Sequence, residues 1–372
     1  MKILFIGARL FEDIALYTKN KGITSILTES NPDSKNLELA DAHYIVPRGM
    51  EGPKEVALKE DVDAVLPLIG IDKPLIEVSK FKEDLENNYG LPVIASPLKT
   101  VITAGDKFKT KEFFIKNSIN TPEFVDISKK LQKSDFPLVL KKLEGQGGSG
   151  IKILSDDADF EICIEDFNEA IAEKFVPGIE ISIEVLRHNG EAVPLVPVYK
   201  GRTTLDCIHP LDKLKTAPLD LDNLDNTHIR RKAAEIADLL GSEGTIDIDI
   251  IFDEKNGFSY FIEINTRPSG TRYLTAASSG VSPMCELVDM AAGEWNSKNV
   301  QKKIKNYAAL EIPIGNYKNK KNNYKFRNFR GENSWVIHGP PGFQRITIRA
   351  KNLKGAFKTA EELNIDYEKF QQ

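Results

Sequence analysis

The sequence predicts an α/β protein, on three observations taken along the chain. Residues 1–96 alternate short aliphatic strands with helical stretches, a pattern typical of an open parallel sheet with helices on both faces. Between residues 136 and 265, strand patterns occur in pairs separated by glycine or polar turn residues, which indicates hairpins. After residue 300 the composition shifts, and two strands followed by a helix are expected. The chain of 372 residues is long enough for more than one domain.

The first 96 residues are expected to form one unit around five parallel strands. Ligands of open parallel sheets bind at the carboxyl ends of the strands. A Rossmann dinucleotide site is nevertheless excluded, because the G-x-G-x-x-G fingerprint is absent and only Gly7 is present at the end of the first strand. The expected strands are 2–6, 24–28, 42–46, 64–67 and 92–94, and the expected helices lie around 10–21, 54–59 and 73–88.

A glycine-rich hairpin is expected over residues 136–154. Its first strand ends at Lys141, and a loop with Gly145, Gly147 and Gly148 follows before the second strand. Glycine lets backbone N–H groups approach a phosphate, because no Cβ stands in the way. The loop is not a Walker A motif, since no GK[ST] closes it and no helix follows. We therefore expect a flap over a nucleotide, with the Lys141 ammonium on its phosphates.

Acidic residues organise the hairpin expected over residues 244–265. Its first strand alternates acidic and aliphatic residues, so Asp247 and Asp249 are expected on one face. The second strand brings Glu263 and Asn265 to the same face. Carboxylate and amide oxygens are hard donors that suit Mg²⁺, which often completes its shell with phosphate oxygens. The sequence therefore predicts a site for Mg²⁺ (or Mn²⁺) on Asp249, Glu263 and Asn265.

The series from Asp249 through Glu263, Asn265 and Arg267 resembles the metal-binding end of the ATP-grasp superfamily. That superfamily includes D-alanine–D-alanine ligase, biotin carboxylase and carbamoyl-phosphate synthase. The whole chain is similar in organisation to pyrrolysine-biosynthesis ligases and to carbamoyl-phosphate-synthase-like proteins. The resemblance implies an ATP-grasp fold with these parts: an N-terminal parallel α/β (pre-ATP-grasp) domain at 1–96, an ATP-grasp domain at 97–300 with its lid at about 122–178, and a small C-terminal α+β domain at 301–372.

The resemblance also implies how ATP is held. A lysine matching Lys107 approaches the phosphates, and a carboxylate matching Glu180 accepts the ribose hydroxyls. Arg267, a cation with fork geometry, joins Lys141 as a catalytic residue. The family often has proline after the lysine that matches Lys141, and Lys142 stands there instead, so it stays open which lysine faces the phosphates. The hinge residues expected around the adenine are Glu173, Lys174, Phe175 and Val176.

Substrate contacts are expected from three places. By the resemblance, the N-terminal domain and the loop after Arg267 face the substrates, although a solvated loop residue or helix cap is the alternative for each N-terminal candidate. A long polar loop between residues 194 and 218 is also expected to face substrate, because long loops inside compact domains are often functional. For His209 in that loop, a hydrogen-bonding contact is favoured over a catalytic role. The candidates are Arg9, Glu29, Asp72, Arg202, Asp206, His209, Ser269 and Arg272.

Composition limits the partners and the compartment. The net charge of -5 gives no general attraction to nucleic acid or to an anionic membrane. The Lys- and Asn-rich segment at 298–328 is therefore interpreted as a solvated loop and not as a nucleic-acid surface. Three scattered cysteines form no disulfide framework or zinc spacing. No apolar run reaches membrane-spanning length, and the N-terminal run is too short for a signal peptide, so a cytoplasmic protein is expected.

Three functions are carried forward. The first is a carboxylate–amine ligase that forms an acyl phosphate from ATP and joins two small molecules, with amino acids as the expected substrates and a homodimer as the oligomer suggested by analogy. The second keeps the fold and uses bicarbonate as the carboxylate. The third is a nucleotide-binding regulatory protein without turnover, against which the set Lys141, Asp249, Glu263 and Asn265 argues.

Overall fold

The computed structural model describes the chain at residues 1–125, 135–142, 150–163, 170–205, 212–219, 221, 223–316 and 329–370. Five of the predicted site residues lie outside these ranges: Gly145, Gly147, Gly148, Asp206 and His209. Within the described residues, no helix is both long and apolar enough to cross a membrane.

The N-terminal part is an α/β unit with a four-stranded parallel sheet in the order β3-β2-β1-β4. The predicted strand over 92–94 is wrong: Val93 makes only an isolated bridge with Val65. Pro92 has no N–H to give to a ladder, and the chain soon turns into the next helix. The elements are β1 (Lys2–Ile6), η1 (Ala8–Asp13), α1 (Ala15–Asn20), β2 (Thr24–Glu29), η2 (Leu37–Leu39), β3 (Ala42–Ile45), α2 (Glu51–Lys59), β4 (Ala64–Pro67) and α3 (Leu75–Tyr89).

Two helices, α4 (Leu98–Gly105) and α5 (Lys107–Lys116), follow where the sequence predicts one helical stretch. Asp106 separates them, because its side chain accepts hydrogen bonds from the backbone N–H groups of Phe108 and Lys109 at 2.9 and 3.1 Å. A carboxylate that caps these free donors starts a new helix at this position.

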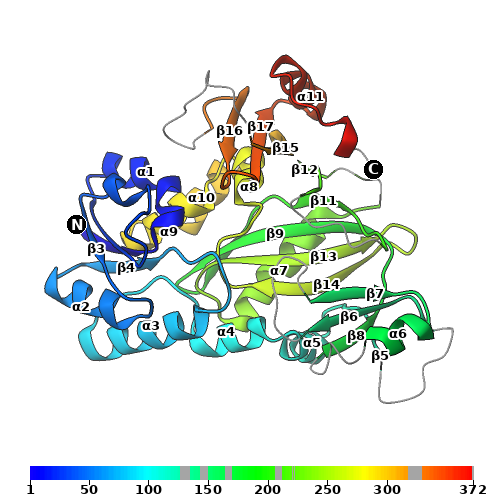
Figure 1. Ribbon diagram of the computed structural model, residues 1–372, viewed down its shortest axis with the longest axis horizontal. Coiled ribbons are helices and arrows are strands. Elements are labelled where there is room, and N and C mark those ends of the chain that lie inside the picture. Colours follow the sequence, from blue (N-terminus) through cyan, green and yellow to red (C-terminus); the bar gives the residue numbers. More distant parts are fainter. Residues whose placement is uncertain are drawn as a thin grey trace.

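An antiparallel sheet in the order β5-β8-β6-β7 forms a separate layer beside α5 (Figure 1). It contains the strands of the glycine-rich hairpin, and apolar side chains such as Leu138, Leu140 and Leu154 form its own small core. The elements are β5 (Phe124–Val125), β6 (Leu138–Lys142), β7 (Ile151–Leu154), α6 (Asp157–Cys163) and β8 (Ala170–Lys174).

The central sheet runs in the order β14-β13-β9-β11-β12-β15-β17-β16, with β10 paired to β9. The C-terminal strands extend this sheet, because β12 pairs with β15 across the boundary predicted at residue 300. The domain boundaries stay predictions. The strands are β9 (Ile179–His188), β10 (Glu191–Pro194), β11 (Val198–Arg202), β12 (Lys215–Ala217), β13 (Gly244–Asp253), β14 (Phe258–Asn265), β15 (Ala308–Gly315), β16 (Ser334–His338) and β17 (Gln344–Ala350).

Five helices accompany the central sheet. Helix α7 packs against β9 and β10, α8 against β15 and β17, and α11 against β15 and β17 on the C-terminal side. The predicted helix over 226–240 agrees with α7. The bounds are α7 (Asn226–Leu240), α8 (Arg272–Ser279), α9 (Pro283–Ala291), α10 (Ser297–Lys303) and α11 (Leu353–Glu362).

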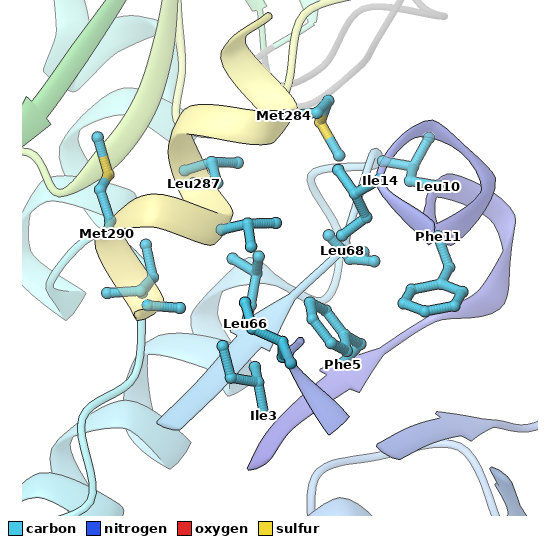
Figure 2. Close-up of a cluster of buried hydrophobic side chains, with 14 of the residues drawn as sticks. Ile3, Phe5, Leu10, Phe11, Ile14, Leu66, Leu68, Met284, Leu287 and Met290 are labelled. Atoms are coloured by element: carbon cyan, nitrogen blue, oxygen red, sulfur yellow. The ribbon is translucent and has the colours of Figure 1, made fainter. Parts of the chain in front are cut away.

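Helix α9 joins the N-terminal sheet to the central body. Figure 2 shows Met284 of this helix pointing toward Ile14 of the N-terminal unit, and Leu287 and Met290 belong to the same buried cluster as Leu66. This shared core holds the strand ends of the N-terminal unit against the chain that follows β14. The unit is therefore placed to contribute to a site on the central sheet.

We expect Leu287→Ala to weaken this joint. Leu287 is 3% exposed, and removing a buried leucine side chain leaves a cavity that destabilises a protein by about 2 to 5 kcal/mol. Urea denaturation would measure the change, with Leu239→Ala as the control because Leu239 is 49% exposed. Equal midpoints for the two variants would contradict the assigned role of this core.

Candidate active site

A row of polar side chains crosses strands β9, β13 and β14. In the register of β13 and β14, Asp247 stands opposite Asn265 and Asp249 opposite Glu263. Residues directly opposite in an antiparallel pair project to the same face. The structure thus brings the three predicted metal ligands together on one face. On the other side of β13, Asp247 stands opposite Glu184 of β9.

Cations from three elements converge on this face. The Lys200 Nζ, on β11, lies 2.7 Å from the Asp249 Oδ1. Burial raises the pKa of Glu263, the charge of Asp249 adds to this effect, and the charges of Lys107, Lys141 and Lys200 oppose it. These three lysines therefore lie close enough to act on the same carboxylate, which is the arrangement that a polyphosphate would need.

The hinge residue Glu173 is buried between two lysines. Its Oε2 lies 2.6 Å from the Lys141 Nζ, and its Oε1 lies 2.9 Å from the Lys111 Nζ. Burial alone would raise the pKa of Glu173, but the charges of Lys141 and Lys111 hold it below its ordinary value. Burial lowers the pKa of Lys111 to about 8. The pair of lysines fixes the position of the hinge carboxylate.

The other hinge residues are partly engaged already. The backbone N–H groups of Lys174 and Phe175 donate to the carbonyls of Glu123 and Pro137, each at 3.0 Å. The Lys174 side chain is also at the surface, 2.7 Å from Glu123. Any recognition of a base edge by this hinge therefore depends on the remaining backbone groups, from the Lys174 carbonyl to Val176.

Glu180, the predicted ribose contact, projects from β9 and accepts a hydrogen bond from the Lys213 Nζ at 2.9 Å. The ammonium neutralises the carboxylate and fixes one of its two oxygens. A ligand with two hydroxyl donors would meet the second oxygen, or would displace the lysine. Lys213 lies in the part of the polar loop that the structure describes, two residues before β12 begins.

Two arginines tie the N-terminal unit to the end of the hairpin. Arg267 forms an ion pair with Asp72, and its Nη2 donates to the Asn265 Oδ1 at 3.1 Å. Arg272, at the start of α8, forms a 2.8 Å ion pair with Asp13 of η1. Three residues predicted as substrate or catalytic contacts thus meet here, and Asp13 completes the set.

Two further carboxylates lie buried beneath this point. Glu184 accepts a hydrogen bond from the Thr245 hydroxyl at 3.1 Å, and its Oε2 has no hydrogen-bond partner among the described residues. The Ser269 hydroxyl donates to the Asp247 Oδ2 at 2.9 Å. Burial, with the neighbouring Asp247 charge, raises the pKa of Glu184 to about 8, and burial with the Asp249 charge raises that of Asp247 to about 6.

Two predicted substrate contacts have other partners. The Glu29 carboxylate accepts backbone N–H groups of Ala8, Ser30 and Asn31 at 2.8, 2.7 and 3.0 Å. These bonds organise the loops at the ends of β1 and β2. Arg202 forms a surface ion pair with Glu254, with 3.0 Å between the Nη2 and Oε1 atoms. Both side chains are therefore occupied by contacts within the protein.

The donor set on the hairpin fits a hard divalent cation. Two carboxylates and one amide oxygen, without histidine or cysteine, match the ligands that Mg²⁺ and Mn²⁺ prefer. Among the described residues, no group of three or more histidine, cysteine or acidic side chains is gathered as a self-sufficient metal cage. The chemistry thus matches an ion that shares its shell with phosphate and water oxygens.

Comparison with known proteins identifies the family. Residues 104–271 match the family model described as "ATP-grasp domain". The chain is 50% identical over 368 residues to a Methanobrevibacter smithii protein named carbamoyl-phosphate synthase, with 98% of this chain and 100% of that protein covered. The chain belongs to the ATP-grasp family. It spans only 30% of the carbamoyl phosphate synthase large chain of Thermoplasma volcanium, to which it is 25% identical over 315 residues.

Solved structures agree with the ATP-grasp fold. The L-amino acid ligase of Bacillus licheniformis has a TM-score of 0.76 at 19% identity, covering 98% of this chain and 96% of that one. The biotin carboxylase domain dimer of Hydrogenobacter thermophilus 2-oxoglutarate carboxylase, in complex with MgADP, ADP and bicarbonate, has a TM-score of 0.74 at 20% identity, covering 97% and 88%. ATP-grasp enzymes use ATP and Mg²⁺, and this chain is an ATP-dependent carbon–nitrogen ligase.

Sequence reasoning missed four residues of this site. Lys111 stands four positions after Lys107 on α5, so the helical period could have placed both on one face. The alternation on β9 could have indicated Glu184, because it shares a face with Glu180. Lys200 and Asp13 had no local signal, since strand pairing and the joint between units bring them to the site.

The pH dependence of stability tests the buried Glu184. Between pH 5 and 8 the folded protein keeps a proton on Glu184 that the unfolded chain releases, because the folded pKa is raised. The free energy of unfolding should fall as pH rises through this window, by up to about 1.4 kcal/mol per pH unit for one group. Glu184→Gln should reduce this fall in the free energy of unfolding. Part of the fall should remain in the variant, because the pKa of Asp247 is also raised. Urea titrations at several pH values would measure both.

The exposed Glu112 provides the control for that measurement, as Glu112→Gln should follow the wild-type profile. A Glu184→Gln profile parallel to wild type from pH 5 to 8 would contradict a raised pKa at this position.

Proposed function

We propose that this ATP-grasp ligase activates a substrate carboxylate as an acyl phosphate and then joins it to an amine. The observation that carries the proposal is the convergence of Lys107, Lys141 and Lys200 on the face that presents Asp249 and Glu263. That arrangement pairs oxygen donors for a metal with cations for a polyphosphate.

Asp249, Glu263 and Asn265 would hold Mg²⁺ (or Mn²⁺), which would bridge and neutralise phosphate oxygens when bound. The lysines would hold the phosphate chain, with Lys141 as the lid lysine, since it points to the buried hinge at Glu173. A carboxylate oxygen of the first substrate attacks the γ-phosphorus, and the bond to the bridging oxygen of ADP breaks. Charge stabilisation and positioning are the main work in such a transfer.

The second half of the reaction takes place at the acyl carbon. The unprotonated nitrogen of the second substrate attacks it, and the bond from this carbon to the phosphate oxygen breaks. Phosphate leaves with the electron pair, and the nitrogen loses one proton to the leaving phosphate or to water, which gives the neutral amide. Arg267 is placed to stabilise the charge on that oxygen, because it touches Asn265 on one side and is fixed by Asp72 on the other. Closing the lid would exclude water, which would otherwise hydrolyse the acyl phosphate.

The lid and metal assignments predict which variants lose ADP release. Lys141→Met and Glu263→Gln should each lower the rate of ADP release by about 100-fold or more, since each removes a charge from the phosphate site. Lys142→Met is the matched control, because Lys142 is exposed on the next position of the same strand. The assay follows ADP from Mg-ATP against a matrix of amino-acid pairs.

Activity in both Lys141→Met and Glu263→Gln would show that these residues are not the phosphate and metal ligands. Loss of activity in Lys142→Met with activity kept in Lys141→Met would transfer the role to Lys142. Tight ATP binding without ADP release across the matrix would favour the regulatory protein without turnover.

Bicarbonate is the second candidate for the carboxylate, and the name of the M. smithii relative favours it. In that reaction bicarbonate oxygen attacks the γ-phosphorus, and an amine nitrogen then displaces phosphate. Labelled bicarbonate separates the two proposals. The amino-acid ligase should release ADP without incorporating the label into a stable carbamate or carbamoyl product, whereas ADP release that requires bicarbonate would overturn it. A homodimer, as in the dimeric biotin carboxylase domain, is proposed for the assembly.

A further inference from the structure

Three arginines gather where the N-terminal unit meets the hairpin, and two of them have acidic partners. Arg267 is paired with Asp72, and Arg272 is paired with Asp13 at 2.8 Å. The third, Arg9, forms no ion pair or side-chain hydrogen bond within the part of the chain that the structure describes. Its side chain is partly covered by the protein but stays accessible to solvent. Arg9 therefore adds a guanidinium that has no acidic partner of its own to the cluster.

Arg9 lies close in the chain or in space to the two loops that carry the paired acids. It lies on η1 four residues before Asp13, which holds Arg272. Its guanidinium packs against Gly70, two residues before Asp72: a Cβ built on Gly70 would lie 2.3 Å from the Arg9 Nη2. The contact requires glycine at position 70, because the guanidinium occupies the space that a side chain would take.

The electrostatics agree with this placement. Burial lowers the pKa of Arg9 first, and the charges of Arg272 and Arg267 lower it further, while Asp13 opposes them. Glu29 is a neighbouring acid, because its carboxylate accepts the backbone N–H group of Ala8, the residue before Arg9. The same carboxylate also accepts the N–H groups of Ser30 and Asn31, so its oxygens are already engaged. An additional anion beside Arg9 would thus relieve repulsion among three guanidinium groups.

A chain of contacts links Arg9 to the predicted metal ligands. Asn265 of the metal set touches Arg267, Arg267 touches Asp72, and the loop of Asp72 touches Arg9 through Gly70. Arg267 therefore contacts the predicted metal set directly, whereas Arg9 is linked to it through Asp72 and its loop. A group bound by Arg9 belongs to a part of the substrate away from the bond that forms.

We infer that Arg9 binds a non-reacting carboxylate of a substrate, so that at least one of the two substrates is an amino acid or a similar compound with a second charged end. A carboxylate carries a single charge, which matches the single unpaired guanidinium, and it accepts the two parallel hydrogen bonds of the arginine fork. A phosphate dianion would exceed the free charge and would stand near the buried carboxylates Asp247 and Glu184. The statement that the bound carboxylate belongs to a substrate rests on the proposed ligase function.

Binding without turnover tests it directly. The probes are amino acids and their decarboxylated counterparts: ornithine and putrescine, lysine and cadaverine, glutamate and 4-aminobutyrate. Calorimetry with Mg-ADP present should give tighter binding for at least one amino acid, by about 10- to 100-fold over its counterpart. Arg9→Met should remove that difference and keep Mg-ADP binding. Arg231→Met, at an exposed arginine of α7, should leave it unchanged.

Gly70→Ala provides a second variant that keeps every charge. The methyl group would lie 2.3 Å from the Arg9 Nη2 and 3.3 Å from the Leu10 Cδ1, both at the ends of flexible side chains, so the variant should fold while its guanidinium is displaced. It should weaken amino-acid binding in the same direction as Arg9→Met. Equal affinity of the wild type for an amino acid and its counterpart, or an Arg9→Met variant that still prefers the amino acid, would overturn the inference.

Chemical modification of arginine tests the Arg9 site even if none of the amino acids or amines binds measurably. Phenylglyoxal should modify the exposed Arg9, and acetate should slow this reaction while leaving that of Arg231 unaffected, as read by peptide mass spectrometry. Absence of protection, or much stronger protection by phosphate than by acetate, would refute a carboxylate site at Arg9. These results are independent of ADP release, so a failed ligase assay and a failed Arg9 site are distinguished.

Discussion

The structure depends on the concentration of acidic side chains on one face of the central sheet. Asp247, Asp249 and Glu263 lie next to one another in register, and Glu184 stands beside Asp247 on the adjoining strand. Carboxylates that share a partly buried face repel one another and lose hydration, so the folded chain needs cations there. Lys200 supplies one of them at 2.7 Å. The ionised carboxylates would also attract a divalent cation. The repulsion that destabilises this face without a ligand would thus favour metal binding.

The cations come from separate segments, and this explains how the parts of the fold cooperate. Lys141 comes from β6, Lys107 from α5 and Lys200 from β11. The two arginines at the end of the hairpin are held by acids of the N-terminal unit. The N-terminal unit thus contacts this end of the hairpin through Asp72 and Asp13, and the apolar core around α9 keeps it in place (Figure 2).

The sequence predicted the parts of the site that depend on local pattern. The period of two placed Asp249, Glu263 and Asn265 on one face, and the alternation in the first 90 residues indicated the parallel sheet. Residues brought in by long-range pairing had no such signal: Lys200 reaches Asp249 only because β11 pairs with β9, and Asp13 reaches Arg272 only through the joint between units. For Glu29 the sequence left a substrate contact and a loop role open, and the structure shows its carboxylate accepting a loop N–H group.

Electron paramagnetic resonance of Mn²⁺ in the presence of ADP tests the central claim most directly, that Asp249, Glu263 and Asn265 form the metal–nucleotide site. The wild type should bind Mn²⁺ tightly only when ADP is present, because the protein ligands and the phosphates share the coordination shell. Glu263→Gln should lose this binding, and Glu254→Gln, which alters a surface partner of Arg202, should keep it. Equal Mn²⁺ binding by wild type and Glu263→Gln would contradict the account.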